Sequence, residues 1–540
     1  MGMKKQNFLK GSVILMVSAV IAKGLGAVFR IPLTNILGGV GMSYFSAAYS
    51  IFMPVYALTV SGLSSACARM TARSCALDMY ANAARIRRVA LGIFSAAGLL
   101  GALGIWLFSA PLSRSSTGNT QAALAVAMIA PSVLFGCITA VERGCCEGQR
   151  NMYPTAVSQT VEGAVKAAAG LALAFYVSRN AGVLAVYFPG ITDMRALSAA
   201  AGILGVTISS AGAVVYFMVR RVFVRREGDT AGERHLESRR SIAGELIRTA
   251  LPLGINALVT NLTAVIDMWT IMQLSGRTAP HIPGVTAEEA PRFMYGSYAG
   301  IALTVFNLVP SVTNMLGKGI LPPITEAWEK GDREGLSRSS LHGLVTAAAI
   351  AVPAAVGLGV LARPVVMLLF PEQRDEAALC VMPLTWLMPG MVCLCLSYPL
   401  FAMLQGIGRA SAPLKITAAG TVVKFLGNVL LIPEMGLTGA ALSTTISFAV
   451  ILIAAAAVYC RASGIRPEFA PFLAVLYAGG MCGGGAYLAY SLAERGGLSL
   501  LWSLIFAISA GGSAYLVTAY IVFGIKKENA LLPRRSQNLS

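Results

Sequence analysis

The residues Phe8–Gly38, FLKGSVILMVSAVIAKGLGAVFRIPLTNILG, form a long apolar stretch that carries Lys23 and Arg30 well inside it. A membrane-spanning helix needs about 20 apolar residues, so this stretch can cross a bilayer. The two cations are about two helical turns apart and share one helix face. Because exposing a cation to lipid is costly, we expect this face to meet an anionic group inside the protein. The alternative is that Arg30 reaches the outer headgroups while a neighbouring helix holds Lys23.

Composition identifies the chain as a membrane protein. Of its 540 residues, 56% are hydrophobic and 12% are charged. Apolar runs recur along almost the whole chain, which predicts an all-α polytopic membrane protein. We expect fourteen transmembrane helices, at residues 8–37, 42–67, 89–112, 122–141, 155–178, 197–219, 249–273, 293–317, 340–362, 378–404, 413–432, 436–459, 470–493 and 499–524.

The basic residues predict the orientation. With fourteen spans, the connections on the side of the N-terminus hold 30 lysines and arginines and those on the opposite side hold 8. Since cytoplasmic loops are enriched in basic residues, both termini are expected in the cytoplasm, with the chain in the cytoplasmic (inner) cell membrane. The net charge of +18 is therefore a topology signal spread over short loops. It does not indicate binding to nucleic acid.

A long charged connection divides the spans into two sets of six. Its mixed signs are typical of a solvated linker. The predicted organisation comprises an N-terminal six-helix lobe (1–219), a cytoplasmic linker (220–248), a C-terminal six-helix lobe (249–466), helices thirteen and fourteen (467–524) and a cytoplasmic tail (525–540).

The two lobes contain a matching motif. Gly148 precedes Pro154 and Lys166, and Gly406 precedes Pro413 and Lys424, with each lysine 18 residues after its glycine. Each proline can begin a helix, which places each lysine about three turns inside the membrane. This repeat predicts two pseudosymmetric lobes that alternate access to a site between them.

Six charged residues are expected within the membrane, and they are Lys23, Arg30, Glu162, Lys166, Asp267 and Lys424. The positions of Glu162 and Lys166 allow an ion pair on one helix. Asp267 has two alternatives, a pair with Lys424 or a role in binding a coupling proton or cation. Four cations against two anions leave an excess that favours a doubly charged anion such as pyrophosphate. Gln159 and Asn428 are candidate hydrogen-bonding residues, although such amides often join helices.

No catalytic or cofactor motif is recognisable. Gly317-Lys318 lacks the glycine and hydroxyl positions of a nucleotide-binding loop, and the three histidines lack metal-ligand spacing. We therefore expect neither an enzyme nor a cofactor or metal site. Transport would then be driven by sodium, by protons or by the membrane potential, with Asp267 as the coupling-ion candidate.

Two segments resemble polysaccharide-type flippases of the multidrug/oligosaccharidyl-lipid/polysaccharide superfamily, which includes stage V sporulation protein B and lipid II flippases. These segments are KGLGAVFRIPL at Lys23–Leu33 and EGQRNMYPTAVSQTVE at Glu147–Glu162, and Lys424 with Asn428 continues the similarity. The resemblance implies a twelve-helix core and the export of undecaprenyl-pyrophosphate-linked sugars by alternating access. It implies that Lys23 and Arg30 face the cavity, while Lys166 stands where relatives more often have arginine.

Taken with the residue pattern, the resemblance predicts a flippase that moves a lipid-linked oligosaccharide, such as a peptidoglycan precursor, to the outer leaflet. An ion-coupled drug exporter and a non-transporting scaffold of envelope or spore assembly are the alternatives. The expected partners are the lipid-linked oligosaccharide and the phospholipid bilayer, with cell-envelope synthesis enzymes as candidates and a monomer as the expected state. The substrate-binding prediction comprises Lys23, Arg30, Lys166, Lys424, Glu162, Gln159 and Asn428.

Overall fold

The structure, a computed structural model, describes residues 8–187, 190–223, 237–278, 285–465 and 468–531. These residues form helices and no strands, so the predicted all-α class is confirmed. Contacts divide the chain into two compact units. The first unit holds the described residues of Met1–Thr304 together with Asn428–Leu437, and the second holds those of Val305–Gly427 and Thr438–Ser540.

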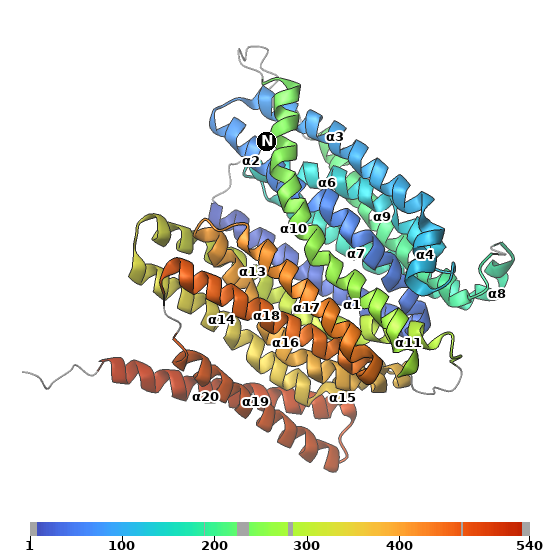
Figure 1. Cartoon of the computed structure of the whole chain (residues 1–540), viewed down its shortest axis with the longest axis vertical. Coiled ribbons are helices and arrows are strands. Elements are labelled where there is room, and N and C mark those ends of the chain that lie inside the picture. The colour runs from blue at the N-terminus through green and yellow to red at the C-terminus, as the bar shows by residue number, and fades with distance from the viewer. Residues whose placement is uncertain (1–7, 188–189, 224–236, 279–284, 466–467, 532–540) are drawn as a thin grey trace, which may run out of the picture. The chain divides into compact units, whose positions relative to one another are not determined.

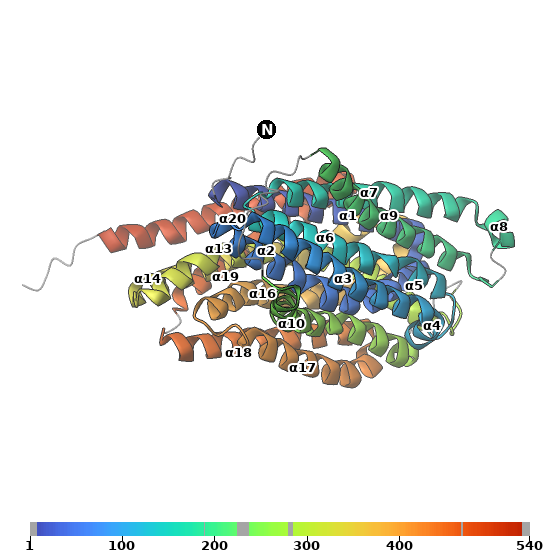
Figure 2. The same cartoon turned by 90° about the horizontal axis from the view of Figure 1, so that it is seen from above.

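The first unit contains long helices together with short ones of four to nine residues. Short π-helices at Ala57–Ser61 and Tyr298–Ala302 interrupt the regular pattern. The helices are α1 (Phe8–Tyr56), α2 (Gly62–Ala76), α3 (Tyr80–Leu107), α4 (Ser109–Thr117), α5 (Ala123–Ile129), α6 (Pro131–Gly148), α7 (Tyr153–Arg179), α8 (Ala181–Leu184), α9 (Met194–Phe223), α10 (Arg239–Leu274) and α11 (Ala290–Ser297). In Figures 1 and 2, α7 lies beside α9, and these two helices pack along their lengths.

The second unit contains the remaining helices. The pair α19 and α20 pack on each other, and α19 also packs on α14. The helices are α13 (Leu308–Glu329), α14 (Arg333–Val360), α15 (Ala362–Leu369), α16 (Arg374–Gly406), α17 (Ala412–Met435), α18 (Leu437–Ser463), α19 (Ala470–Arg495) and α20 (Leu500–Leu531). The last part of α17, from Asn428, belongs to the first unit, and the short α12 (Leu303–Phe306) crosses the boundary between the units in the sequence.

Twelve helices among the described residues are long and apolar enough to span a membrane, or thirteen if the bent pair Ala290–Phe306 and Leu308–Glu329 forms one span. The first of them, Val20–Ala76, has 57 residues. A straight helix of that length would measure about 85 Å, against a hydrocarbon core of about 30 Å. Gly38 interrupts it with a φ of 63°, so this run contains two membrane-length segments. Counting unbroken helices gives twelve or thirteen spans among the described residues. The number of fourteen is not confirmed and stays a prediction.

Helix ends differ from the predicted ones where charged residues continue a helix. Helix α6 runs to Gly148 and so includes Arg143, which the sequence places in a loop. Helix α10 begins at Arg239, inside the predicted linker, and the Ser238 side chain accepts a hydrogen bond from the Ser241 backbone at its start. A helix can leave the hydrocarbon core and continue in water, where hydropathy no longer marks its end.

The repeated motif has the same local structure in both places. Pro154 lies in the first turn of α7 and Pro413 in the first turn of α17, as predicted. The preceding loops turn at matching positions, because Arg150 has a φ of 58° and Gly408 a φ of 81°. Glycine adopts this left-handed conformation without strain. The predicted lobe boundaries (1–219 and 249–466) stay a prediction, since the first unit described above also includes residues beyond 249.

Candidate functional site: a cationic cluster in the first unit

Arg30 lies on α1 and is held by a backbone carbonyl. Its Nη2 donates to the carbonyl oxygen of Ala299 at 2.9 Å. Ala299 belongs to the π-helix Tyr298–Ala302, and such a turn disturbs the regular pairing of carbonyl groups within a helix. Thr34, one turn after Arg30, donates to the next carbonyl, that of Gly300, at 3.3 Å. The guanidinium is therefore bound inside the first unit, and the alternative in which it reaches the headgroups is not observed.

The Nε of Arg30 is buried and has no hydrogen-bond partner among the residues that the structure describes. A buried N–H without a partner is unfavourable, and it is more unfavourable when the group is charged. Arg30 therefore keeps a donor for which an anionic ligand is a suitable acceptor.

Lys166 lies on α7 and contacts aromatic side chains of α1. Its Nζ donates to the hydroxyl oxygen of Tyr49 at 2.8 Å. The same Nζ lies 5.0 Å from the ring centroid of Phe29 and 5.1 Å from that of Tyr49. An ammonium over an aromatic face is stabilised by the electrons of the ring without being neutralised. Lys166 is therefore held by one hydroxyl group and two aromatic rings of α1.

Tyr49 contacts one of the two cations and lies near the other. It accepts the hydrogen bond from Lys166, and it also lies within electrostatic range of the Arg30 guanidinium. Tyr295 of α11 is in range of Arg30 as well, and its hydroxyl is 3.1 Å from that of Ser50. We call Arg30, Lys166 and Tyr49 the cationic cluster. Among the described residues, no carboxylate oxygen lies within 4.0 Å of the Arg30 or Lys166 nitrogens.

Glu162 does not form the pair with Lys166 that their spacing allows. It pairs instead with Arg143 of α6, whose Nη2 lies 2.8 Å from Oε2 of Glu162. The Nε of Arg143 donates to Ser158, one turn before Glu162, at 2.9 Å. The local pair that the spacing allows is not formed, because α6 supplies a guanidinium that binds Glu162 and Ser158 at once. Among the described residues, Lys166 therefore has no carboxylate within ion-pair distance.

Asp267 forms a second polar group with Asn428. The Asn428 Nδ2 donates to Oδ1 of Asp267 at 3.0 Å and to Oγ1 of Thr270 at 2.8 Å. Asp267 is 3% exposed, and the other two residues are fully buried. The Oδ1 of Asn428 is buried with no hydrogen-bond partner among the described residues. The group thus combines a carboxylate, a hydroxyl and an available amide oxygen.

The remaining predicted site residues lie as follows. Lys424 is buried in the second unit, where its carbonyl oxygen accepts a hydrogen bond from Ser443. Gln159 is half-buried on α7. The side chain of Lys23 lies outside the described residues, although its backbone belongs to α1. The structure thus brings together Arg30 and Lys166 around one tyrosine, and Asp267 with Asn428.

Sequence reasoning missed Tyr49 and Arg143. Tyr49 lies in an apolar run with several other aromatic residues and carries no pattern that distinguishes it. Arg143 had a detectable signal, because Glu142-Arg143 immediately follows a membrane-length apolar run. The described residues include no group of three or more His, Cys, Asp or Glu side chains arranged to hold a metal ion.

Comparison with known protein families identifies the chain. The family model described as "Polysaccharide biosynthesis protein" matches residues 8–328, and the MatE model matches residues 297–430. Stage V sporulation protein B of Bacillus subtilis (strain 168) is 23% identical over 539 residues, which cover 97% of each chain. The lipid II flippase MurJ of the same organism is 22% identical over 459 residues, or 83% of this chain and 81% of MurJ.

A solved structure shows the same fold. The inward closed conformation of the lipid II flippase MurJ aligns with a TM-score of 0.64 at 14% sequence identity, covering 96% of this chain and 100% of that one. The fold expected from the flippase resemblance is thus confirmed. The chain belongs to the polysaccharide biosynthesis protein family and is a multi-pass membrane transporter of the multidrug/oligosaccharidyl-lipid/polysaccharide superfamily.

Proposed function

We propose that this transporter moves an undecaprenyl-pyrophosphate-linked sugar from the inner to the outer leaflet by alternating access. The observation that carries the proposal is the cationic cluster, in which Arg30 and Lys166 have no acid partner among the described residues. Cations in surroundings of low dielectric attract anions strongly. A pyrophosphate bears the charge and the oxygen acceptors that such a cluster requires.

The two cations suit different parts of this headgroup. The planar guanidinium of Arg30 offers several donors and can bind two phosphoryl oxygens at once. Lys166 acts as a point charge, and Tyr49 holds it in place. Glu162, paired with Arg143, supports α7 on α6 and leaves Gln159 as a candidate ligand of the sugar. Lys23, Lys424 and Asn428 stay predicted substrate ligands.

The relatives support this substrate class. MurJ is named as a lipid II flippase, and stage V sporulation protein B is similar over nearly its whole length. A peptidoglycan precursor or another lipid-linked oligosaccharide is the substrate we propose, with the polyprenyl tail remaining in lipid. Cell-envelope synthesis enzymes that make or consume this substrate are the candidate partners.

A binding assay with purified protein tests the proposal. We expect polyprenyl-pyrophosphate sugars to bind, and Lys166→Gln to weaken binding about tenfold or more, because a hydrogen bond to a charged group contributes about 1.5–3 kcal/mol. The matched control is Lys415→Gln, an exposed lysine that should have no effect. Equal binding by the wild type and Lys166→Gln would show that the cluster does not hold the headgroup.

An ion-coupled drug exporter is the second candidate, favoured by the MatE match over residues 297–430. An exporter of lipophilic cations needs anionic side chains in its site, whereas Arg30 and Lys166 would repel such substrates. A lipophilic phosphonium cation belongs in the same binding assay. Strong binding of this cation together with no binding of the pyrophosphate would favour the exporter.

We propose that Asp267, Asn428 and Thr270 bind a coupling cation. Oxygen ligands from a carboxylate, an amide and a hydroxyl suit sodium, and a buried carboxylate can alternatively carry a proton. Asp267 and Thr270 both accept hydrogen bonds from Nδ2 of Asn428. The Oδ1 of Asn428 has no hydrogen-bond partner among the described residues and can therefore bind a cation. Protons and the membrane potential are the other proposed driving forces.

The variant Asp267→Asn tests this coupling. We expect sodium or a proton gradient to stimulate transport by the wild type, and the variant to lose that stimulation while it keeps substrate binding. Glu288→Gln, at an exposed site, is the control. Unchanged stimulation in Asp267→Asn would exclude this carboxylate from coupling.

A further inference from the structure

A cavity lies between the second half of α2 and the beginning of α10, and no residue of the cationic cluster lines it. Its volume is 820 Å³, and its lining includes four arginines and one glutamate. The charged lining residues are Arg69, Arg73, Arg240, Glu245 and Arg248. Figure 1 shows these two helices side by side, and they are in contact.

The charge of this cavity is strongly positive. Glu245 is the only acid among the lining residues of the cavity. It forms an ion pair with Arg73, whose Nη1 lies 3.5 Å from Oε1 of Glu245. The other three arginines therefore have no acid among the lining residues to balance their positive charge. The N-terminal end of the long helix α10 also points its positive dipole end toward this region. Several arginines around one space are typical of a site that binds phosphoryl groups.

The cavity continues onto an apolar surface. Pro252 and Leu253 are part of its lining, and Leu253 is 44% exposed. Ile247 and Leu251, on the same part of α10, are 46% and 51% exposed. Exposed aliphatic side chains beside a cationic cavity are suited to contact the acyl chains of a lipid. The cavity thus has a cationic end and an apolar end, as an anionic lipid has a headgroup and tails.

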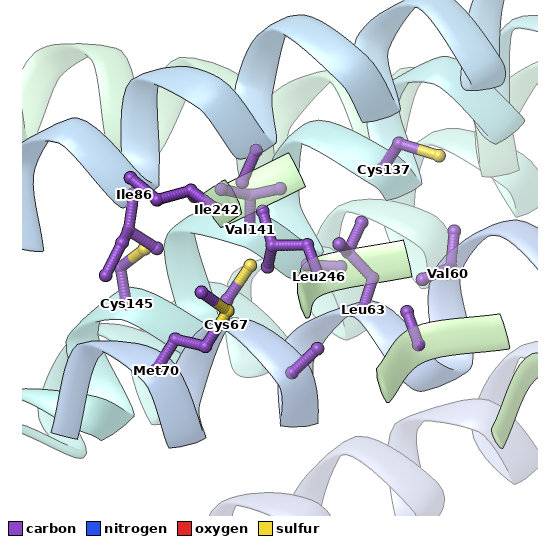
Figure 3. Close-up of a cluster of buried hydrophobic side chains, with 14 residues drawn as sticks. Val60, Leu63, Cys67, Met70, Ile86, Cys137, Val141, Cys145, Ile242 and Leu246 are labelled. Atoms are coloured by element: carbon purple, nitrogen blue, oxygen red, sulfur yellow. The ribbon is translucent and has the colours of Figure 1, made fainter. Parts of the chain in front are cut away.

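A packed core holds the two helices in position. Figure 3 shows Ile242 and Leu246 of α10 beside Leu63 and Cys67 of α2, within one buried cluster. At Gly62 of α2 an added Cβ would lie 2.1 Å from the carbonyl oxygen of Ala250, so the backbones are in direct contact. The arginines are therefore carried by a fixed pair of helices and not by a loop.

We propose that this cavity binds the phosphoryl headgroup of an anionic phospholipid. The lipid would belong to the leaflet beside the basic loops, which is the cytoplasmic leaflet in the predicted orientation. A free phosphate offers the same chemistry but lacks the tails that the apolar end would contact. The site is distinct from the proposed substrate cluster, so its test does not depend on transport of a sugar.

Gly244 offers a test that leaves the charges unchanged. A Cβ added there meets no heavy atom within 4 Å, so a side chain can begin at this position, and we expect Gly244→Leu to occupy part of the cavity. The full chain in nanodiscs of phosphatidylcholine, with and without phosphatidylglycerol, is the sample. The phosphatidylglycerol retained by the purified protein is measured by native mass spectrometry. We expect Gly244→Leu to reduce retention about tenfold, and Arg69→Gln about fivefold.

Two controls separate binding from folding and from general charge. The first control is Gly92→Leu in α3, because a Cβ added at Gly92 also meets no heavy atom within 4 Å. The second control is Arg338→Gln, which removes an exposed arginine that does not line the cavity. Both should retain phosphatidylglycerol as the wild type does. Wild-type retention in Gly244→Leu and Arg69→Gln would overturn the proposal. Full displacement of the lipid by inorganic phosphate would overturn it too, because it would indicate a site for soluble anions.

Discussion

The variant Arg30→Ala is expected to reduce transport of lipid-linked sugars about 100-fold while the protein folds normally. Arg30 combines a charge without an acid partner, a half-buried position and a buried Nε without a partner among the described residues. Truncating one member of a buried, hydrogen-bonded charge pair typically removes 2–5 kcal/mol of binding free energy, or about 30-fold and more. The measurement is the initial rate of transport by purified protein in vesicles.

Arg30→Lys separates charge from geometry. Lysine keeps the positive charge but cannot bind two phosphoryl oxygens side by side, so we expect it to restore only part of the activity. Arg338→Ala, at an exposed position, should transport as the wild type does. Full activity in Arg30→Ala would mean that Arg30 serves the packing of α1 against the π-helix and does not bind substrate.

The variant Gly296→Ala is expected to lower the free energy of unfolding by about 3 kcal/mol, at the upper end of the usual range for overpacked cores. Gly296 of α11 packs against the second half of α1, and its Cβ would lie 1.6 Å from the carbonyl oxygen of Gly39. It would also lie 2.7 Å from the backbone nitrogen of Ser43. Because all the contacted atoms belong to the backbone, the two helices would have to separate.

The midpoint of thermal unfolding in detergent measures this effect. The matched control is Gly104→Ala in α3, where an added Cβ meets nothing within 4 Å. Alanine in an open helical position stabilises by about 0.4–1 kcal/mol, so this variant should unfold at the wild-type midpoint or slightly above it. An unfolding midpoint in Gly296→Ala equal to that of Gly104→Ala would contradict the close contact of α1 and α11.

The helical fold was predictable because the bilayer imposes a length and a hydropathy on each span. The two prolines that begin α7 and α17 were predictable for a similar local reason, since proline fits the first turn of a helix. Helix ends were not, because α6 and α10 extend through charged residues such as Arg143 and Arg240. The division of the first run at Gly38 depends on one dihedral angle, which hydropathy does not report.

The cations of the candidate site were predictable, but their partners were not. A charge within an apolar run is visible in the sequence, and this identified Arg30 and Lys166. Their partners lie far along the chain, because Ala299 is 269 residues from Arg30 and Tyr49 is 117 from Lys166. The same holds for Asn428, which is 161 residues from Asp267. Helical spacing suggested a partner for Glu162 four residues away, whereas packing supplied Arg143.

The most direct test of the central claim follows a fluorescent polyprenyl-pyrophosphate sugar in sealed vesicles that contain the purified transporter. The fraction of the sugar that an added, membrane-impermeant reagent can modify reports its movement between leaflets. We predict that the wild type moves this lipid and that Arg30→Ala moves it about 100-fold more slowly, with equal amounts of folded protein in both. Transport of a lipophilic cation by both proteins, with no movement of the lipid-linked sugar by either, would contradict a cluster that serves a pyrophosphate.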